Sequence, residues 1–137
     1  MNLKVFVYGT LKPGESNYQR YCVGKVVEEI EAIAFGQLFN LPLGYPAMTL
    51  GENPIHGYLL TFAEPGILTF LDELEDYDPH RMPEENEYNR QQIEVYNPKG
   101  QSLGLAWVYL MAFEQVQRLE GVMVSAGSWS GDIMQAT

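Results

Sequence analysis

A strand pattern that stops at a glycine constrains this chain more than any other feature. Apolar and β-branched residues dominate positions 3–8, Gly9 follows at once, and a polar loop stiffened by Pro13 comes next. The backbone N–H groups from Tyr8 to Leu11 thus lie where strand pairing is expected to end, and some of them are expected to lack partners. Unpaired N–H groups beside a glycine form a concavity that favours anions, with phosphate and carboxylate equally open at this stage.

The same turn lacks the other parts of a nucleotide phosphate loop. Gly9 and Gly14 have the glycine spacing of that motif, but Glu15 and Ser16 follow where a lysine and a Ser or Thr are needed. No start of a helix is evident there either. The turn is therefore not expected to hold the phosphates of a nucleotide.

Length and composition limit the classes of protein that are open to this chain. Its 137 residues are predicted to form one domain, 1–137, and a hydrophobic content of 46% is typical of a globular protein. Eight Lys and Arg against eighteen Asp and Glu give a net charge of −10, which argues against nucleic acid or an anionic membrane as the main partner. A small anionic substrate stays open, because local donors can outweigh the distant field.

A cytoplasmic location is expected from three further observations. No segment approaches the roughly 20 apolar residues of a membrane span. The apolar run near the N-terminus is too short for a signal peptide. Cys22 is the only cysteine, so no internal disulfide can form and a reduced compartment is the simpler interpretation.

The succession of strand and helix patterns predicts an α+β domain. Strands are expected at 3–8, 30–39, 55–62, 91–96 and 102–111, and helices at 63–77 and 113–120. Two prolines and a glycine place 41–46 in a loop, and 78–89 is predicted to be a charged loop. Because strands dominate, the expected architecture is a curved mixed sheet or an open barrel with short helices.

Glu75 is the acidic residue drawn closest to the expected core. At about 100° per residue, the predicted helix has an apolar stripe formed by Ile67, Phe70, Leu71 and Leu74. Glu75 follows Leu71 by one turn and so lies at the edge of this stripe. Two interpretations are open: its carboxylate reaches water, or the carboxylate is desolvated at a pocket wall and its pKa rises into the range useful for acid–base catalysis.

Other residues with reactive side chains do not form a recognisable site. The acidic residues Glu84, Glu85 and Glu87 are typical of a solvated loop, and His56 in a strand is typical of a structural histidine. Cys22 has no companion that would mark it as a nucleophile. No Cys/His spacing indicates a metal site, and neither a metal nor a cofactor is expected.

Several short elements follow one another over most of the chain. They are Tyr8-Gly9-Thr10-Leu11 with Pro13, Gly14 and Asn17; Gly44-Tyr45-Pro46-Ala47; Gly57; Leu71-Asp72-Glu73-Leu74-Glu75; Tyr88-Asn89-Arg90; Ala106-Trp107-Val108-Tyr109; and Gly127-Ser128-Trp129. In this order they resemble the gamma-glutamylcyclotransferase-like, or AIG2-like, family. The resemblance implies a small mixed β-barrel of about five or more strands, with flanking short helices and a cavity at one end.

The resemblance also implies a reaction and roles for residues. The Tyr8-Gly9-Thr10-Leu11 loop would hold the α-carboxylate of a small γ-glutamyl substrate, and Glu75 would be the catalytic acid/base. The α-amine of the substrate would attack its own γ-carbonyl, releasing 5-oxoproline and an amine or amino acid without a cofactor. Tyr109 would line the cavity, although a strand tyrosine that faces inward is as often part of the core.

The sequence leaves the leaving group and two alternative functions open. Asp76 follows Glu75 where the family often has a small residue, and the loop at 78–89 is long and acidic. The leaving group is expected to be recognised by pocket walls built from the loops at 41–49 and 78–89. The first alternative is a non-catalytic binding module for a γ-glutamyl or other carboxylate ligand. The second is a related enzyme that removes a γ-glutamyl protecting group from a larger metabolite by the same mechanism.

Overall fold

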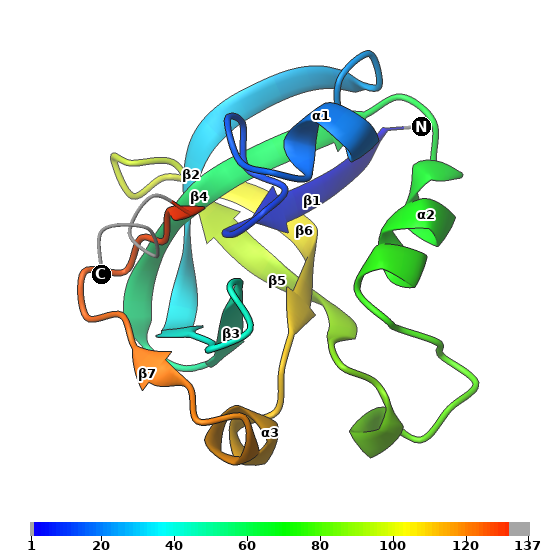
Figure 1. Ribbon diagram of the computed structural model, residues 1–137. Helices are drawn as coiled ribbons and strands as arrows, with labels where there is room; N and C mark the ends of the chain where they lie inside the picture. Colours follow the sequence, from blue (N-terminus) through cyan, green and yellow to red (C-terminus); the bar gives the residue numbers. More distant parts are fainter. Residues whose placement is uncertain (1, 132–137) are drawn as a thin grey trace.

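The computed structural model describes residues 2–131 of this protein (Figure 1). The strands are β1 (Leu3–Val7), β2 (Val26–Asn40), β3 (Pro46–Leu50), β4 (Asn53–Phe62), β5 (Asn89–Tyr96), β6 (Ser102–Leu110) and β7 (Val122–Met123). The helices are α1 (Tyr18–Tyr21), α2 (Ile67–Leu74) and α3 (Phe113–Arg118), with a 3₁₀ helix, η1, at Pro83–Glu85.

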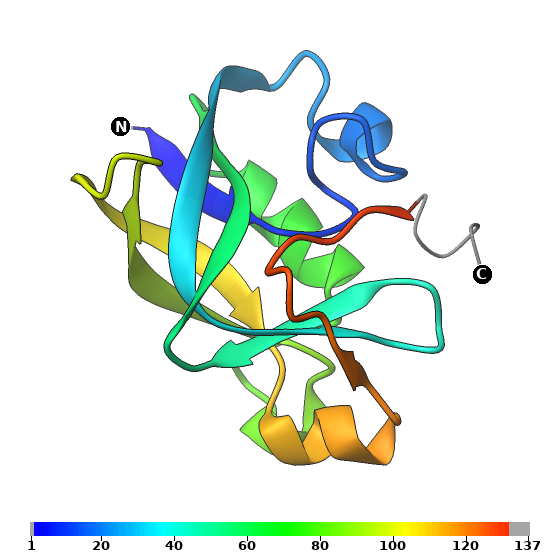
Figure 2. The same ribbon diagram turned by 90° about the vertical axis from the view of Figure 1, so that its left-hand side faces the viewer.

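The strands form one mixed sheet of seven strands, and the α+β class is thereby confirmed. Neighbours follow the order β3-β2-β4-β1-β6-β5, and β7 pairs with β2. The long strand β2 pairs first with β4 and then with β3, and Figure 2 shows it bending between these two partners. Tyr96 of β5 also faces Ile33 of β2. The barrel implied by the resemblance stays a prediction.

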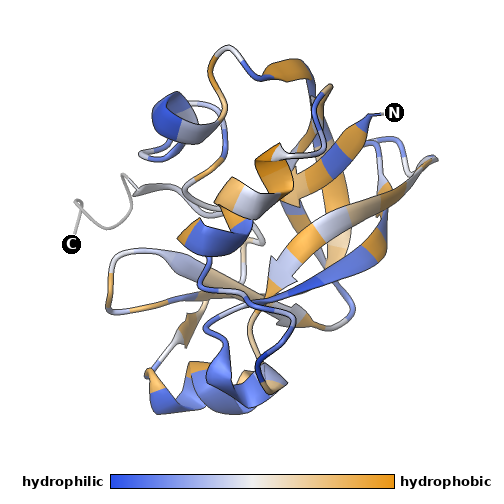
Figure 3. Cartoon of the chain, turned by 90° about the vertical axis from the view of Figure 1, so that its right-hand side faces the viewer, coloured by the Kyte–Doolittle hydropathy of each residue, from blue (hydrophilic) through white to orange (hydrophobic). Residues whose placement is uncertain are grey.

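Alternation along β1 places its side chains in two separate buried clusters. Val5 and Val7 belong to a cluster that includes Leu71 of α2, whereas Phe6 and Tyr8 belong to the other. Helix α2 therefore covers one face of the sheet. Figure 3 shows hydrophobic residues over most of α2 and hydrophilic ones near its C-terminal end. Strand β1 thus ends between two packed layers, beside the polar end of α2.

Helix α2 is shorter than the predicted helix at 63–77. It begins at Ile67, after the turn that contains Pro65, and Glu75 is its C-cap. Asp76 has a φ of 53°, a left-handed conformation that ends the helix. Because the helix stops there, Glu75 is the residue at which the chain leaves α2. Phe70, predicted in the apolar stripe, is exposed instead.

Two further boundaries differ from the sequence prediction. The predicted loop at 41–46 is wrong at its last residue, because Pro46 begins β3. A proline is tolerated as the first residue of a strand, where its missing N–H matters least. The predicted strand at 30–39 starts too late, since β2 begins at Val26. The other predicted strands and the last helix differ from the structure only at their ends.

Candidate active site

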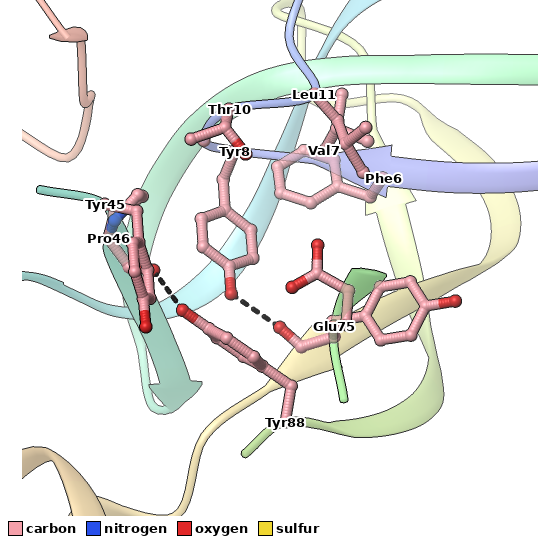
Figure 4. Close-up of a pocket in the computed structure, with 11 residues that line it drawn as sticks. Phe6, Val7, Tyr8, Thr10, Leu11, Tyr45, Pro46, Glu75 and Tyr88 are labelled. Atoms are coloured by element: carbon pink, nitrogen blue, oxygen red, sulfur yellow. Dashed lines mark hydrogen bonds between the residues drawn. The ribbon is translucent and has the colours of Figure 1, made fainter. Parts of the chain in front are cut away.

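A pocket lies where β1 ends, and it gathers residues from five separate segments (Figure 4). Its volume is about 40 Å³. It is lined by Phe6, Val7, Tyr8, Gly9, Thr10, Leu11, Tyr45, Pro46, Glu75, Tyr88 and Tyr109. Every residue that was proposed for the site is therefore present in one cavity. Tyr45, Pro46 and Tyr88 come from the two loops expected to form pocket walls but were not named individually, and Phe6 and Val7 were not assigned to the site.

The turn at 8–11 lines this pocket and has free backbone donors. Among the described residues, none of its four N–H groups has an acceptor. The turn is held from outside, because Lys12 N donates to the Gly9 carbonyl at 3.0 Å and Asn17 Nδ2 donates to Thr10 Oγ1 at 2.9 Å. Unpaired N–H groups in a fixed turn favour a negatively charged group.

Gly9 is needed because the turn packs directly against the chain at Pro46. A Cβ atom added to Gly9 would lie 2.6 Å from Pro46 Cγ. Neither side can easily move, since Pro46 begins β3 and its carbonyl oxygen accepts a hydrogen bond from the Tyr88 hydroxyl at 2.6 Å. The glycine thus allows two walls of the pocket to meet.

Three buried tyrosines form a fixed frame around the pocket. The hydroxyl of Tyr8 donates to the carbonyl oxygen of Tyr109 at 2.6 Å and accepts from the backbone N–H of Met48 at 3.3 Å. The Tyr109 hydroxyl points to Asp72 Oδ1 at 2.7 Å, so Tyr109 lines the pocket while its own donor is occupied. Burial is the main cause that raises the pKa of Tyr8, Tyr88 and Tyr109, and these side chains stay neutral at physiological pH.

Asp72 is neutralised by an arginine from the neighbouring strand. Arg90 Nε lies 2.9 Å from Asp72 Oδ1, and both side chains are largely buried, with 16% of each exposed. The guanidinium group also lies over the rings of Trp107 and Tyr77, at 4.5 and 5.2 Å from their centroids. The ion pair and the Tyr109 hydroxyl tie the last turn of α2 to β5 and β6.

Glu75 extends from the end of α2 into the pocket, where Figure 4 shows its carboxylate pointing into the space beside Tyr8. No hydrogen bond to this carboxylate is found among the described residues. Desolvation by burial, followed by the negative charge of Glu87, raises the pKa of Glu75 to about 8. Of the two interpretations of Glu75, the geometry matches the desolvated carboxyl group at a pocket wall.

The remaining candidates do not line the pocket. His56 is exposed on β4, and its backbone N–H donates to the Gly127 carbonyl. Cys22 is buried, and desolvation raises the pKa of its thiol to about 12, so it stays protonated. Glu84 and Glu85 are exposed as predicted, but Glu87 is partly buried and accepts a hydrogen bond from Tyr45.

Residues 2–131 lack two kinds of feature. They contain no group of three or more His, Cys, Asp or Glu side chains arranged to hold a metal ion. No helix within that range is long and apolar enough to cross a membrane.

Some of the pocket residues that were not named from the sequence belong to motifs that are visible in it. Tyr45, Pro46 and Tyr88 belong to the short elements that resemble the family, but nothing in the sequence shows that they meet Glu75. Phe6 and Val7 look like ordinary strand residues, and only the end of β1 at the pocket gives them a place in it.

Comparison with known proteins identifies the family of this chain. A family model described as gamma-glutamyl cyclotransferase, AIG2-like, matches residues 5–131. This chain belongs to that family. The family resemblance predicted from the sequence is thereby confirmed.

Two curated relatives are similar to this member of the family. A Vibrio cholerae protein named "Putative gamma-glutamylcyclotransferase" is 31% identical over 125 residues, which cover 91% of this chain and 93% of that protein. A Niallia circulans protein named "Gamma-L-glutamyl-butirosin B gamma-glutamyl cyclotransferase" is 32% identical over 106 residues. That match covers 77% of this chain and 65% of the relative.

Solved structures with low sequence identity share the fold. A mouse AIG2-like protein superposes with a TM-score of 0.68 at 20% identity, covering 94% of this chain and 88% of the mouse chain. The YkqA protein of Bacillus subtilis superposes with a TM-score of 0.70 at 23% identity and covers 99% of this chain. This chain spans 42% of the Bacillus chain.

Proposed function

We propose that this protein is a γ-glutamyl cyclotransferase, which converts a small γ-glutamyl conjugate into 5-oxoproline and a free amine or amino acid. One observation carries the proposal: unpaired backbone N–H groups and an unpartnered carboxyl group of raised pKa line the same pocket. The family of the chain and the names of its relatives support the same activity.

The turn at 8–11 is proposed to bind the α-carboxylate of the γ-glutamyl group. Its four N–H groups are free to donate, and hydrogen bonds from N–H groups to a carboxylate are stronger than those to a neutral acceptor. Fixing this end of the substrate inside a small pocket limits the conformations of its three-carbon chain. The α-amine is then held close to the γ-carbonyl carbon, which supplies much of the rate acceleration of a ring closure.

Glu75 is proposed to relay protons during the reaction. The α-nitrogen enters as an ammonium group and becomes a ring amide, so it loses two protons. Loss of the first allows it to attack the γ-carbonyl carbon and form the new C–N bond. The departing nitrogen gains two protons as the original C–N bond breaks. One carboxyl group between the two nitrogens can accept a proton from the first and donate it to the second.

The pKa of Glu75 suits both steps of this relay. A value of about 8 leaves both the acid and the carboxylate accessible near neutral pH. A substrate ammonium group beside Glu75 favours the carboxylate form, which is the base needed at the start. After proton uptake, the dry and negatively charged surroundings favour the acid form, which is the donor needed at the end. No redox or nucleophilic side chain takes part in this route.

The experiment that tests the proposal is replacement of Glu75 by Gln. The purified protein is incubated with γ-glutamyl amino acids and γ-glutamyl amines, and 5-oxoproline is measured by mass spectrometry. We expect Glu75→Gln to lower the release of 5-oxoproline by about a hundredfold or more, since the variant cannot transfer the proton. Glu73→Gln, an exposed position on the same helix, is the matched control and should keep wild-type turnover.

Two outcomes would overturn the proposal. Wild-type turnover by Glu75→Gln would show that the acid/base lies elsewhere. Thermal stabilisation of the wild-type protein by γ-glutamyl ligands without any product would favour the non-catalytic binding module.

A further inference from the structure

The loop that follows β1 is joined to the last described residues of the chain. Nζ of Lys12 donates a hydrogen bond to the backbone carbonyl of Trp129, and Oε1 of Glu15 accepts one from the backbone N–H of Gly131 at 3.0 Å. In Figure 2 the last described residues, in red, lie beside this loop, in blue. The chain directly after the turn at 8–11 is therefore connected to a segment that is distant in the sequence.

The segment that receives these contacts, residues 127–131, is itself held on the sheet. The carbonyl oxygen of Gly127 accepts a hydrogen bond of 2.7 Å from the backbone N–H of His56 on β4. The side chain of Trp129 is buried, and its Nε1 donates to Oδ1 of Asn40 on β2 at 2.9 Å. Residues 127–131 thus give the loop a fixed support that is anchored on two strands.

Lysine is a costly residue at position 12. Lys12 is only 8% exposed, and neither of the two ion pairs found within residues 2–131 includes it. Burial lowers the pKa of Lys12, although the charge of Glu15 opposes this shift. An ammonium group withdrawn from water without a carboxylate partner costs free energy that a methionine of similar length would not. The hydrogen bond to Trp129 is therefore what distinguishes lysine from an apolar residue at this position.

The turn depends on such support because backbone N–H groups are its means of binding an anion. No Lys, Arg or His is among the residues that line the pocket. A bound carboxylate would therefore rely on the direction of the N–H groups at 8–11, and hydrogen bonds weaken steeply when the donor points away from the acceptor. Lys12 directly follows these groups, and its own N–H donates to the Gly9 carbonyl at 3.0 Å. A displacement of Lys12 thus changes the direction of the donors.

We propose that Lys12 is a positioning residue for the turn at 8–11, which it connects through Trp129 to the anchored segment 127–131. This inference rests on the proposed function, because it assumes that the turn holds the α-carboxylate of the substrate. Lys12 is not among the residues that line the pocket, so it acts through the direction of the N–H groups and not by contact with the substrate. Loss of its hydrogen bond is expected to weaken recognition of the carboxylate more than any other part of binding.

Binding of two synthetic ligands that differ in one group tests the proposal. They are γ-glutamyl-n-butylamide and its analogue in which a neutral α-carboxamide replaces the α-carboxylate. Calorimetry with Glu75→Gln measures both affinities without turnover, and we expect the carboxylate ligand to bind about a hundredfold more tightly. Adding Lys12→Met should reduce this ratio about tenfold, because the N–H groups lose their alignment. The affinity for the carboxamide should change much less.

Three further variants in the same background separate positioning from a general effect. Lys4→Met removes the same charge at an exposed position of β1 and should keep the ratio. Lys12→Arg keeps a donor for the Trp129 carbonyl and should retain most of the ratio. Glu15→Ala removes the acceptor of the Gly131 N–H and should reduce the ratio by less than Lys12→Met does. Glu15→Ala also tests the same connection if Lys12→Met does not fold.

Amide hydrogen exchange reports the order of the turn without a ligand. The backbone N–H groups at positions 12 and 17 donate to the carbonyls of Gly9 and Thr10, at 3.0 and 2.8 Å. Both should exchange faster in Lys12→Met than in the wild-type protein. The N–H groups at 58–60, on β4 between β1 and β2, should keep their protection.

The outcomes distinguish this inference from the proposed function. An unchanged ratio in Lys12→Met overturns the inference and leaves the cyclotransferase activity standing. Equal weakening of both ligands also overturns it, since a merely structural role gives that result. A reduced ratio in Lys12→Met, with the ratio kept in Lys4→Met, supports the inference even if the wild-type protein releases no 5-oxoproline.

Discussion

Two carboxyl groups one turn apart at the end of α2 have opposite surroundings. Asp72 receives the hydroxyl of Tyr109 and the guanidinium group of Arg90, and it joins the helix to the sheet. Glu75 receives neither, extends into the pocket, and has a pKa raised to about 8. The difference arises because α2 ends between them: Asp72 is still on the helix, and Glu75 is its C-cap.

This contrast shows how one short helix can combine an acid paired with the sheet and an unpaired acid that lines a pocket. Asp72 is paired and hydrogen-bonded, whereas a desolvated carboxyl group without a partner, such as Glu75, takes up a proton near neutral pH. Satisfying Asp72 also fixes the backbone from which Glu75 extends. The contacts of Asp72 thus hold Glu75 in position although the Glu75 carboxyl group has no hydrogen-bond partner among the described residues.

The largest expected effect concerns the dependence of stability on pH. Between the ordinary carboxyl pKa of 4.5 and about 8, the unfolded chain has released the proton of Glu75 while the folded protein still holds it. The folded state binds more protons in this window, so Glu75 lowers the free energy of unfolding as the pH rises through it. Glu75→Gln removes this slope, and the variant should gain roughly 3–5 kcal/mol relative to wild type between pH 5 and pH 8.

Urea unfolding of both proteins at several pH values measures this difference. Glu73→Gln is the control, because it makes the same change of residue at an exposed position of the same helix. Parallel curves for Glu75→Gln and wild type would show that Glu75 titrates normally and would end the contrast with Asp72.

Only part of the contrast between Asp72 and Glu75 could be predicted from the sequence. Periodicity placed Glu75 beside the apolar stripe, and the break at Gly9 placed free N–H groups near the start of the chain. Both are local patterns, which is why they could be predicted. Helix α2, however, was predicted to continue to position 77, whereas it ends at Leu74 and Glu75 is its C-cap.

Long-range contacts account for the rest of what was missed. The partners of Asp72 are Arg90 and Tyr109, which lie on two other strands, and no local pattern reports that register. Glu87 was predicted to be a solvated residue. Its hydrogen-bond partner, Tyr45, comes from a loop 42 positions earlier in the chain, so no local pattern indicates the contact. The mixed sheet and its strands could be predicted from alternation, but the meeting of five segments at one pocket could not.

Removing the cation beside Asp72 is expected to have the next largest effect. Arg90→Met keeps an unbranched apolar stem over Trp107 but leaves the Asp72 carboxylate without its positive partner. Loss of one partner of a buried ion pair costs about 3–5 kcal/mol, and since this pair is partly exposed we expect about 2–3 kcal/mol. Arg81→Met, which breaks the more exposed pair with Asp76, should cost less than about 1 kcal/mol. Equal losses in the two variants, measured by chemical unfolding, would contradict the structural role of Asp72.

Removing the hydroxyl group of Tyr109 is expected to have a smaller effect. Tyr109→Phe deletes the hydrogen bond to Asp72 but keeps the ring that lines the pocket. Hydrogen bonds to charged groups contribute about 1.5–3 kcal/mol, and because Arg90 still neutralises Asp72 we expect a loss near the lower value. Tyr96→Phe, which removes an exposed hydrogen bond to Glu94, should leave the unfolding midpoint unchanged. A stability loss that is the same for both variants would show that the Tyr109 hydroxyl does not hold Asp72.

The smallest effect is expected from removing the negative charge of Glu87, which acts on the pKa of Glu75. Burial is the main cause of its raised pKa, and the charge of Glu87 is the second. Glu87→Gln removes a negative neighbour, so the carboxylate form of Glu75 is less disfavoured and its pKa should fall while staying above the ordinary value of 4.5.

The pKa of Glu75 can be followed by ¹³C NMR of the Glu side chains, with the Glu75 signal identified by its absence in Glu75→Gln. Glu84→Gln, exposed on the same segment, should leave that pKa in place. If the pKa of Glu75 were unchanged in Glu87→Gln, the charge of Glu87 would not act on the pocket, and burial alone would account for the raised pKa of Glu75.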